Sequence, residues 1–303
     1  MQKFVVLLLA VGLPIVTSHP SSYSHTADLT ETSMSCPGNR ESQLLEIGHP
    51  PKARSAIQPS PNIKLVSYNI RYRSGDDLHK LAQLLRDDPE IGGATILGLQ
   101  EVDRNKKRTG NKNTVQILAE ELGMYYAWAA PPAAPGSKEE DTGVAILSAY
   151  PLTDVCRLVL PHKGPGGRRR AALGATINLG GTDVRFYSVH SDSRIPVACK
   201  LEQMNTAIKE LACHRKDMPA VILGDLNTWE PAAVDKTFKL FAAANFHTPF
   251  DEQPTFFRRA LFITIELKLD WIWLRNLAAT SHGIDQTIKL SDHWPLWIKV
   301  NVR

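Results

Sequence analysis

Short apolar segments alternate with amphipathic ones from residue 62 to the C-terminus, and this alternation limits the folds that the chain can adopt. Short segments rich in branched apolar residues are typical of buried β-strands. Eight strands are predicted: Ile63–Asn69, Thr95–Glu101, Val144–Ala149, Leu173–Leu179, Val184–His190, Ala220–Asp225, Leu269–Leu274 and Leu296–Val302. Because no linker interrupts the series, we expect one α/β domain over residues 62–303.

The segments between these strands show helical spacing or turn signals. The pair Gly180-Gly181 is typical of a hairpin, which makes the strands on either side of it antiparallel. Helices are predicted from apolar spacing and end signals over Asp76–Asp88, Thr114–Gly123 and Pro196–His214. We therefore expect a mixed sheet arrangement in the middle of the domain, with helices outside.

The N-terminus has the pattern of a secretory signal. Lys3 precedes an apolar run at residues 4–16, and small residues follow it. The run is shorter than the ~20 residues of a membrane span, so we predict a cleaved signal peptide at residues 1–18; the alternative is an uncleaved anchor. Residues 19–61, rich in Ser, Thr and Pro, are predicted to be a flexible leader. The expected location is secreted or periplasmic, with no stable membrane insertion after cleavage.

Polar residues with reactive groups gather at the ends of the predicted strands. An apolar strand that ends in such a residue places it at the rim of a sheet, and several rims on one side converge in a cleft. The residues in these positions are Asn69, Glu101, His190, Asp225, Asn227, Asp270, Asp292 and His293. Each also has a purely structural alternative, such as a turn residue, a solvated acid or a helix cap.

Taken together, these residues favour metal-assisted chemistry. Carboxylate and amide oxygens are the donors that hard cations such as Mg²⁺ prefer, with Mn²⁺ or Ca²⁺ as alternatives. The two histidines add groups that can transfer protons near neutral pH, and an aspartate beside one of them can orient its ring. The formal charge of +4 favours an anionic partner but is too small for a protein that coats nucleic acid.

Two basic stretches lie next to these residues. Arg170 ends the run 168–170, and its guanidinium can hold phosphate oxygens; alternatively, the run is a charged surface hairpin. The stretch from Arg104 to Lys112 follows Glu101 and can add positive potential beside the cleft, although such runs are usually solvated loops. Both stretches favour an anionic substrate if they reach the cleft.

Eight ordered segments cover most of the predicted domain: VSYNI, ILGLQEVD, GVAILSAYPL, RRRAAL, FYSVHSD, VILGDLNTW, LDWIWL and LSDHWPLW. In this order they resemble the motif series of the endonuclease/exonuclease/phosphatase family, the deoxyribonuclease I-like metal-dependent phosphohydrolases. The GD-x-N and SDH segments, with LQE upstream, are the most specific part. The resemblance implies a four-layer α/β sandwich, in which two mixed β-sheets lie between helices and the site lies at one end.

The resemblance also implies a metal site and a water-activating pair. Asn69, Glu101 and Asp292 correspond to metal-site residues, with Glu101 as the direct ligand of Mg²⁺, Mn²⁺ or Ca²⁺. Asp225 and Asn227 correspond to the pair that orients or deprotonates the attacking water and steadies the phosphorane oxygens.

Further roles are implied for the histidines. His293, paired with Asp270, corresponds to the histidine that contacts the scissile phosphate or serves as base. His190 corresponds to the group that protonates the leaving oxygen, and Arg170 to an arginine on the phosphate. Asp192 departs from the pattern, because relatives often have Leu-Gly directly after the histidine.

The implied activity is that of a secreted, divalent-metal-dependent nuclease or general phosphodiesterase. A phosphomonoesterase and a phospholipid or sphingomyelin phosphodiesterase are alternatives, although no inserted hydrophobic hairpin is evident. A catalytically silent binding protein of the same fold is disfavoured because no motif residue is missing. The expected partner is an anionic phosphate ester, with nucleic acid as one candidate; no protein partner is indicated.

Overall fold

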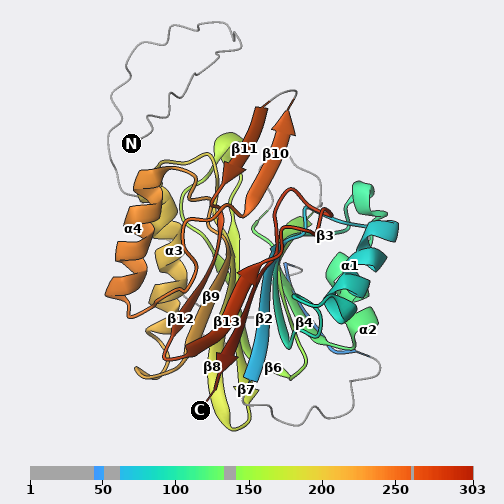
Figure 1. Ribbon diagram of the computed structural model, residues 1–303, viewed down its shortest axis with the longest axis horizontal. Helices are drawn as coiled ribbons and strands as arrows, with labels where there is room; N and C mark the ends of the chain where they lie inside the picture. Colours follow the sequence, from blue (N-terminus) through green and yellow to red (C-terminus); the bar gives the residue numbers. More distant parts are fainter. Residues whose placement is uncertain (1–43, 51–61, 133–140, 261–262, 303) are drawn as a thin grey trace, which may run out of the picture. The chain divides into compact units, whose positions relative to one another are not determined.

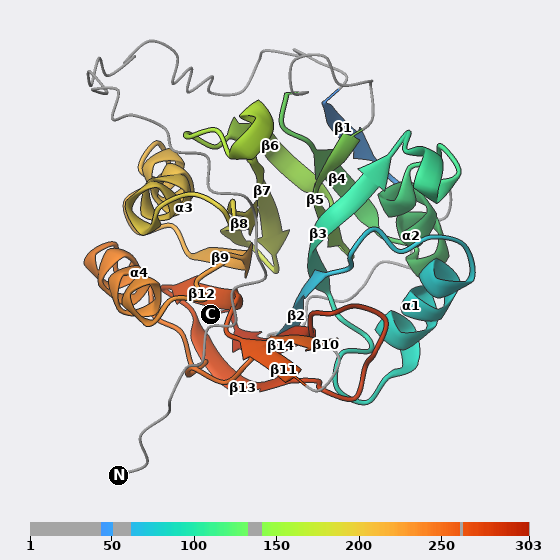
Figure 2. The same cartoon turned by 90° about the horizontal axis from the view of Figure 1, so that it is seen from above.

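Two mixed β-sheets face each other, and each carries two helices on its outer side (Figures 1 and 2). The computed structural model describes residues 44–50, 62–132, 141–260 and 263–302, all within one compact unit, Met34–Arg303. The predicted four-layer α/β sandwich is confirmed. The predicted signal peptide, residues 1–18, lies outside the described residues.

The larger sheet has the strand order β1-β4-β5-β3-β2-β14-β13, and only β2 and β3 run parallel within it. Its strands are β1 (Leu45–Gly48), β2 (Asn62–Asn69), β3 (Ile96–Arg104), β4 (Tyr125–Ala129), β5 (Asp141–Ser148), β13 (Ala278–Ile284) and β14 (Leu296–Asn301). Helices α1 (Gly75–Asp87) and α2 (Thr114–Leu122) cover its outer face. Helix α2 begins where the Asn113 side chain accepts two backbone N–H groups and ends at Gly123, whose φ is +63°.

The smaller sheet has the order β12-β9-β8-β7-β6, and only β8 and β9 run parallel within it. Its strands are β6 (Leu152–Val159), β7 (Ala171–Leu179), β8 (Thr182–His190), β9 (Ala220–Asp225) and β12 (Asp270–Arg275). Helices α3 (Val197–Leu211) and α4 (Pro231–Ala243) cover its outer face. Trp273 of β12 stacks on Phe241 of α4 with ring centroids 4.4 Å apart, so aromatic packing fixes α4 on the sheet.

The eight predicted strands and three predicted helices are all present, with ends that differ by at most three residues. The hairpin at Gly180-Gly181 joins β7 and β8 in antiparallel register. The sequence prediction missed helix α4, although Pro231 at its first turn and the buried series Ala233, Val234, Thr237 and Phe241 are helical signals. No helix within the described ranges is long and apolar enough to cross a membrane.

A two-stranded hairpin extends beyond the ends of the sheets (Figure 1) and consists of β10 (Phe256–Ala260) and β11 (Ile263–Leu267). Ile263 and Ile265 on β11 are 59% and 40% exposed, an unusual position for isoleucine. The sequence had given no sign of such a hairpin, because two arginines in β10 interrupt its apolar character. Its position beside the candidate site makes it relevant to substrate choice.

Strand β1 lies inside the range that was predicted to be a leader. It pairs with β4, and the Glu46 carboxylate accepts hydrogen bonds from Asn113 Nδ2 and Tyr126 OH, both at 2.7 Å. The predicted leader, residues 19–61, therefore contributes a strand to the larger sheet. Four residues are too few to show a periodic pattern, so only the pairing partner reveals the strand.

Candidate active site

The register of the smaller sheet places three of the predicted site residues directly opposite one another on adjacent strands. His190 lies opposite Asp225 in the parallel pair β8 and β9, and Asp225 lies opposite Asp270 in the antiparallel pair β9 and β12. Residues paired in this way on adjacent strands have neighbouring Cα atoms. The polar ends of three strands therefore meet at one end of the sheet, as the sequence predicted.

Turns at the strand ends fix where the reactive side chains point. Asp225 Oδ1 accepts the backbone N–H of Asn227 at 3.1 Å, and Asn69 Oδ1 accepts that of Arg71 at 3.1 Å. Asn227 has a positive φ of +53°, and its Nδ2 donates to the Ser191 carbonyl at 2.9 Å. A structural role in the turn and a role in the site are therefore compatible for these residues. The same hydrogen bond that pairs a backbone N–H group of the turn also orients the side chain.

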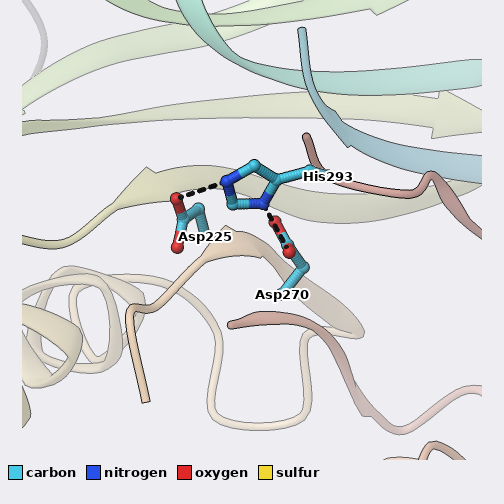
Figure 3. Close-up of side chains that lie close together, drawn as sticks. All are labelled: Asp225, Asp270 and His293. Atoms are coloured by element: carbon cyan, nitrogen blue, oxygen red, sulfur yellow. Dashed lines mark hydrogen bonds and ion pairs between the residues drawn. The ribbon is translucent and has the colours of Figure 1, made fainter. Parts of the chain in front are cut away.

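His293 lies between two aspartates (Figure 3). Its Nδ1 donates to Asp270 Oδ2 at 2.8 Å, and its Nε2 lies 3.8 Å from Asp225 Oδ2. Thr255 Oγ1 donates to the same Asp270 oxygen at 2.7 Å, and the Phe256 ring packs edge-on against the imidazole. Asp270 and Thr255 therefore hold the ring with Nε2 directed at Asp225.

Asp225 Oδ2 is the point at which three nitrogen groups converge. Asn69 Nδ2 donates to it at 3.0 Å, His190 Nε2 lies at 3.5 Å and His293 Nε2 at 3.8 Å. Burial raises the pKa of the Asp225 carboxyl, which makes this carboxylate a stronger base than an exposed one. Burial opposes the charged form of His293, but the Asp270 and Asp225 carboxylates outweigh it and raise the pKa of His293.

His190 is held by Arg170, whose Nη1 donates to His190 Nδ1 at 3.3 Å. Burial and then the Arg170 charge lower the pKa of His190 well below its ordinary value. The ring is therefore neutral, with the proton on Nε2, the nitrogen that faces Asp225. A neutral imidazole suits a hydrogen-bond donor to phosphate or leaving-group oxygen.

Asp192 is a functional neighbour that the sequence analysis noted only as a departure from the family pattern. It is 1% exposed, and its Oδ2 lies 3.5 Å from Arg170 Nε. Its Oδ1 accepts the backbone N–H of Arg194 at 2.8 Å. Asp192 therefore positions the guanidinium that holds His190. The sequence contained one indication of this role, because Asp192 lies two residues after His190, which ends a predicted strand.

We expect Asp192→Asn to lower kcat/KM about tenfold, because it removes the charge that holds Arg170 but keeps the side-chain size. The loss should appear mainly as a higher KM, since Arg170 is expected to bind phosphate. Asp183→Asn, at the exposed start of β8, the strand that precedes Asp192, is the matched control. Equal kinetics for the two variants would contradict this role.

Glu101 reaches the site through an irregularity in β3. The register between β3 and β5 shifts between Gln100 and Val102, and Glu101 has a φ of +56°. Leu99 and Val102 both pack in the apolar cluster on the helix side, so Glu101 is the extra residue of a β-bulge. A left-handed conformation costs a residue with a side chain about 1–3 kcal/mol and is typical of functional positions. Without the bulge, strict alternation would direct Glu101 toward the helices.

The donors around Glu101 fit a hard cation. Within the part of the chain that the structure describes, the Glu101 carboxylate makes no hydrogen bond or ion pair, and it lines the cavity. Asn69 contributes an amide oxygen on the neighbouring strand β2. Asp292 also lines the cavity, although Arg71 Nη1 already lies 3.1 Å from its Oδ2. An unpaired carboxylate, an amide oxygen and a second carboxylate are donors of the kind that Mg²⁺ prefers.

A second possible cation position is formed by Asp225, Asp270 and His293. Their donor atoms all lie within 4.8 Å of one another, and Asp270 Oδ1 is buried with no hydrogen-bond partner among the described residues. However, Asp270 Oδ2 already accepts two hydrogen bonds, and imidazole is a poorer ligand than oxygen for a hard cation. The donor set at Glu101 therefore fits Mg²⁺ better.

All the predicted site residues except Asn69 and Asp270 line one cavity of about 630 Å³, and those two bond directly to residues that do. Its walls carry many cations: Arg71, Lys106, Arg108, Arg168, Arg169, Arg170 and Arg258. The hairpin contributes Phe256, Arg258 and Leu267, and Trp229, which is 50% exposed, lies beside Asn227. The cavity therefore offers positive charge and aromatic surface around the Asp225 centre.

Comparison with known proteins identifies the family. The model of the Endonuclease/Exonuclease/phosphatase family matches residues 66–293. The chain belongs to this family. The match spans the segments from β2 to His293, so the residues described above occupy the family's own region of the chain.

Several known proteins are similar to this chain in structure or sequence. A family protein from Leptotrichia buccalis has a TM-score of 0.62 at 18% identity, over 79% of this chain and 100% of its own. D. rerio TDP2, complexed with a single strand DNA product, has a TM-score of 0.62 at 15% identity, over 80% and 99%. Protein cwh43 of Schizosaccharomyces pombe is 27% identical over 134 residues, which are 43% of this chain but only 13% of that protein.

Proposed function

We propose that this family phosphoesterase is a secreted, divalent-metal-dependent phosphodiesterase that hydrolyses P–O bonds of nucleic acid. The observation that carries the proposal is the convergence of His190, Asn69 and His293 on one oxygen of Asp225. The convergence lies in a cavity with arginine-rich walls and an unpaired Glu101 carboxylate.

Glu101, Asn69 and Asp292 would hold the cation, which supplies charge neutralisation at the phosphate oxygens when it is bound. Asp225 takes the proton of the attacking water as the new P–O bond forms and the ester P–O bond breaks. The Asn227 N–H keeps the Asp225 carboxylate in place through its 3.1 Å hydrogen bond.

The two histidines, whose Nε2 atoms both face Asp225 Oδ2, complete the chemistry. Charged His293, held by Asp270 at 2.8 Å, presents Nε2–H to a phosphoryl oxygen. Neutral His190 donates a hydrogen bond from Nε2–H to the leaving oxygen as the ester bond breaks, and the leaving oxygen takes its proton from solvent water. Arg170, 3.3 Å from the His190 ring, adds a guanidinium that can bind a phosphoryl oxygen.

Nucleic acid is the preferred substrate class because the cavity walls combine cations with exposed aromatic surface. Phosphate backbones are attracted by arginine and lysine, and bases stack on aromatic rings. Trp229 provides such a ring next to Asn227. The complex of TDP2 with a DNA product gives a precedent for a polynucleotide on this fold.

A lipid phosphodiester is the second candidate, and the hairpin favours it. Ile263 and Ile265 are exposed on the same hairpin whose Phe256 and Leu267 line the cavity. Exposed isoleucines on a projecting hairpin could contact acyl chains while the head group enters the cavity. A lipid substrate therefore belongs in the test.

The proposed secretion is supported by the apolar run at residues 4–16 with Lys3 before it. We expect expression of the full chain to release a protein whose first residue lies near position 19. N-terminal sequencing of the released protein checks this prediction. A cell-associated protein that retains Met1 would show that the run is an anchor or is not recognised.

The function is tested by a substrate panel with the purified chain and Mg²⁺. The panel contains single-stranded DNA, RNA, bis-p-nitrophenyl phosphate, p-nitrophenyl phosphate and sphingomyelin vesicles. We expect cleavage of nucleic acid and the diester, loss of cleavage with EDTA and recovery with excess Mg²⁺. The Asp225→Asn variant, purified in parallel, controls for contaminating nucleases.

Other patterns of cleavage in this panel would indicate a different function. Cleavage of p-nitrophenyl phosphate alone would indicate a phosphomonoesterase, and cleavage of vesicles alone a lipid phosphodiesterase. Binding of DNA without cleavage of any substrate would indicate a binding protein of the same fold.

A further inference from the structure

The basic residues that follow Glu101 are not equivalent. Arg104 pairs with Asp141 at 2.9 Å and Glu46 at 3.2 Å, lies over the Trp128 ring and is only 12% exposed, so it stabilises the sheet edge. Lys107 lies in the same short helical turn, Lys107–Thr109, as Arg108, but only Arg108 of these two lines the cavity. Arg108 is therefore the residue of this turn that can meet a substrate.

The Arg108 guanidinium is held rigidly from one side. Its Nε and Nη2 donate to the two oxygens of Asp103 at 2.6 and 2.9 Å, and Nη2 also donates to Thr142 at 3.2 Å. Asp103 is fully buried, so its carboxylate cannot follow the arginine into solvent. A two-point pair of this kind fixes both the position and the plane of a guanidinium.

The Tyr72 ring fixes the same group from a second direction. The Arg108 guanidinium carbon lies 3.5 Å from the centroid of the Tyr72 ring. The backbone of Tyr72 is itself placed, because its N–H donates to the Glu101 carbonyl at 2.8 Å. Arg108 therefore lies a few residues after β3, the strand that carries Glu101, on the wall of the cavity formed by the larger sheet.

One edge of Arg108 remains available. Its side chain is 43% exposed, and Nη1 makes no hydrogen bond to any residue in the described ranges. His190 and Asp225 lie on the smaller sheet, and Arg170 directly precedes its strand β7, so all three lie on the other wall of the same cavity. A phosphate held at the Asp225 centre therefore leaves Arg108 for a different anionic group.

We propose that Arg108, supported by Asp103 and Tyr72, binds a second phosphate of the substrate, next to the one that is cleaved. The inference rests on the proposed function, since it presumes that the scissile phosphate occupies the Asp225 centre. The Asp103–Arg108 pair is formally neutral, so recognition depends on the N–H groups of the free edge rather than on net charge. Substrates with adjacent phosphates, as in a polynucleotide, are then preferred over isolated diesters.

The test compares the thymidine dinucleotides TpT, pTpT and TpTp, which share one scissile diester and differ in a terminal phosphate. For the wild type we expect kcat/KM for pTpT or TpTp to exceed that for TpT by about 10- to 100-fold, the value of a charge-assisted hydrogen bond. Arg108→Gln should bring this ratio close to one. Arg108→Lys, which keeps the charge but not the fork, should retain only part of the preference. Lys107→Gln, in the same turn, should keep it all.

A ratio is used because a general loss of stability lowers all three rates together and leaves the ratio unchanged. Should Arg108→Gln leave Asp103 unpaired and unfold the chain, the double variant Asp103→Asn/Arg108→Gln removes both charges and gives the same expected ratio. A wild type without preference, or an unchanged ratio in Arg108→Gln, overturns the inference.

Failure of the proposed function is distinguishable from failure of this inference. If the wild type cleaves none of the three dinucleotides and none of the nucleic acids and diesters of the substrate panel, the proposed function fails, and binding of TpT, pTpT and TpTp is measured by calorimetry. Tighter binding of a phosphorylated form that disappears in Arg108→Gln supports the second phosphate site. Equal binding of all three overturns it.

Discussion

Asp225→Asn is expected to lower kcat about 10³-fold on any phosphodiester that the wild type cleaves, the scale of losing a general base. The substitution keeps the oxygen that accepts the Asn227 N–H at 3.1 Å, so the turn after β9 should persist. It removes the anionic oxygen on which Asn69, His190 and His293 converge. The loss should therefore fall on kcat, with KM changed little.

The control for this experiment is Asp285→Asn. Asp285 is also buried, and its Oδ1 also accepts a backbone N–H two residues later, from Thr287 at 2.8 Å, but it does not line the cavity. Circular dichroism melting curves of both variants show whether folding is preserved. Activity of Asp225→Asn within tenfold of the wild type would remove Asp225 from the role of base.

Glu101→Gln is expected to lower activity at least about 100-fold at limiting Mg²⁺, because loss of a ligand should cost no less than loss of an outer-sphere partner. The concentration of Mg²⁺ that gives half-maximal activity should rise. The Glu101 carboxylate has no hydrogen bond or ion pair among the described residues, so the change should not disturb the fold. Magnesium titration of activity, with Mn²⁺ in a parallel series, measures the effect.

The matched variant for this titration is Asp270→Asn, since Asp270 belongs to the other possible cation position. We expect Asp270→Asn to reduce kcat, because it loosens His293, without changing the Mg²⁺ concentration needed. If the Mg²⁺ requirement rises in Asp270→Asn but not in Glu101→Gln, the cation lies at Asp225, Asp270 and His293 instead.

The sequence was sufficient for the parts of the molecule that follow local rules. Buried strands such as Ala220–Asp225 are apolar along their whole length, and the α3 segment places apolar residues on one helical face, so composition and spacing predict both. The polar residues at strand ends were also visible, because an apolar segment followed by Asp225 or His190 marks a sheet rim. The order of the eight motif segments along the chain then indicated the family resemblance.

Other features depended on pairing and distance, which no local pattern contains. Strand β1 exists because β4 offers it a partner, and the hairpin of β10 and β11 is recognisable by its pairing rather than by its composition. The register of β8, β9 and β12 places His190, Asp225 and Asp270 directly opposite one another on adjacent strands. A shift of one residue would turn every side chain to the other face of the sheet.

The fold class, most strands and the set of reactive residues were therefore predictable without coordinates, because strand propensity, helical periodicity and motif order are properties of neighbouring residues. The contacts that place these residues around the cavity became visible in the folded chain alone. The bulge at Glu101, the support of Arg170 by Asp192 and the anchoring of Arg108 on Asp103 all join residues by backbone geometry and burial. Register shifts, ion pairs and hydrogen bonds of this kind depend on distances of a few tenths of an ångström, which the fold sets and the sequence does not display.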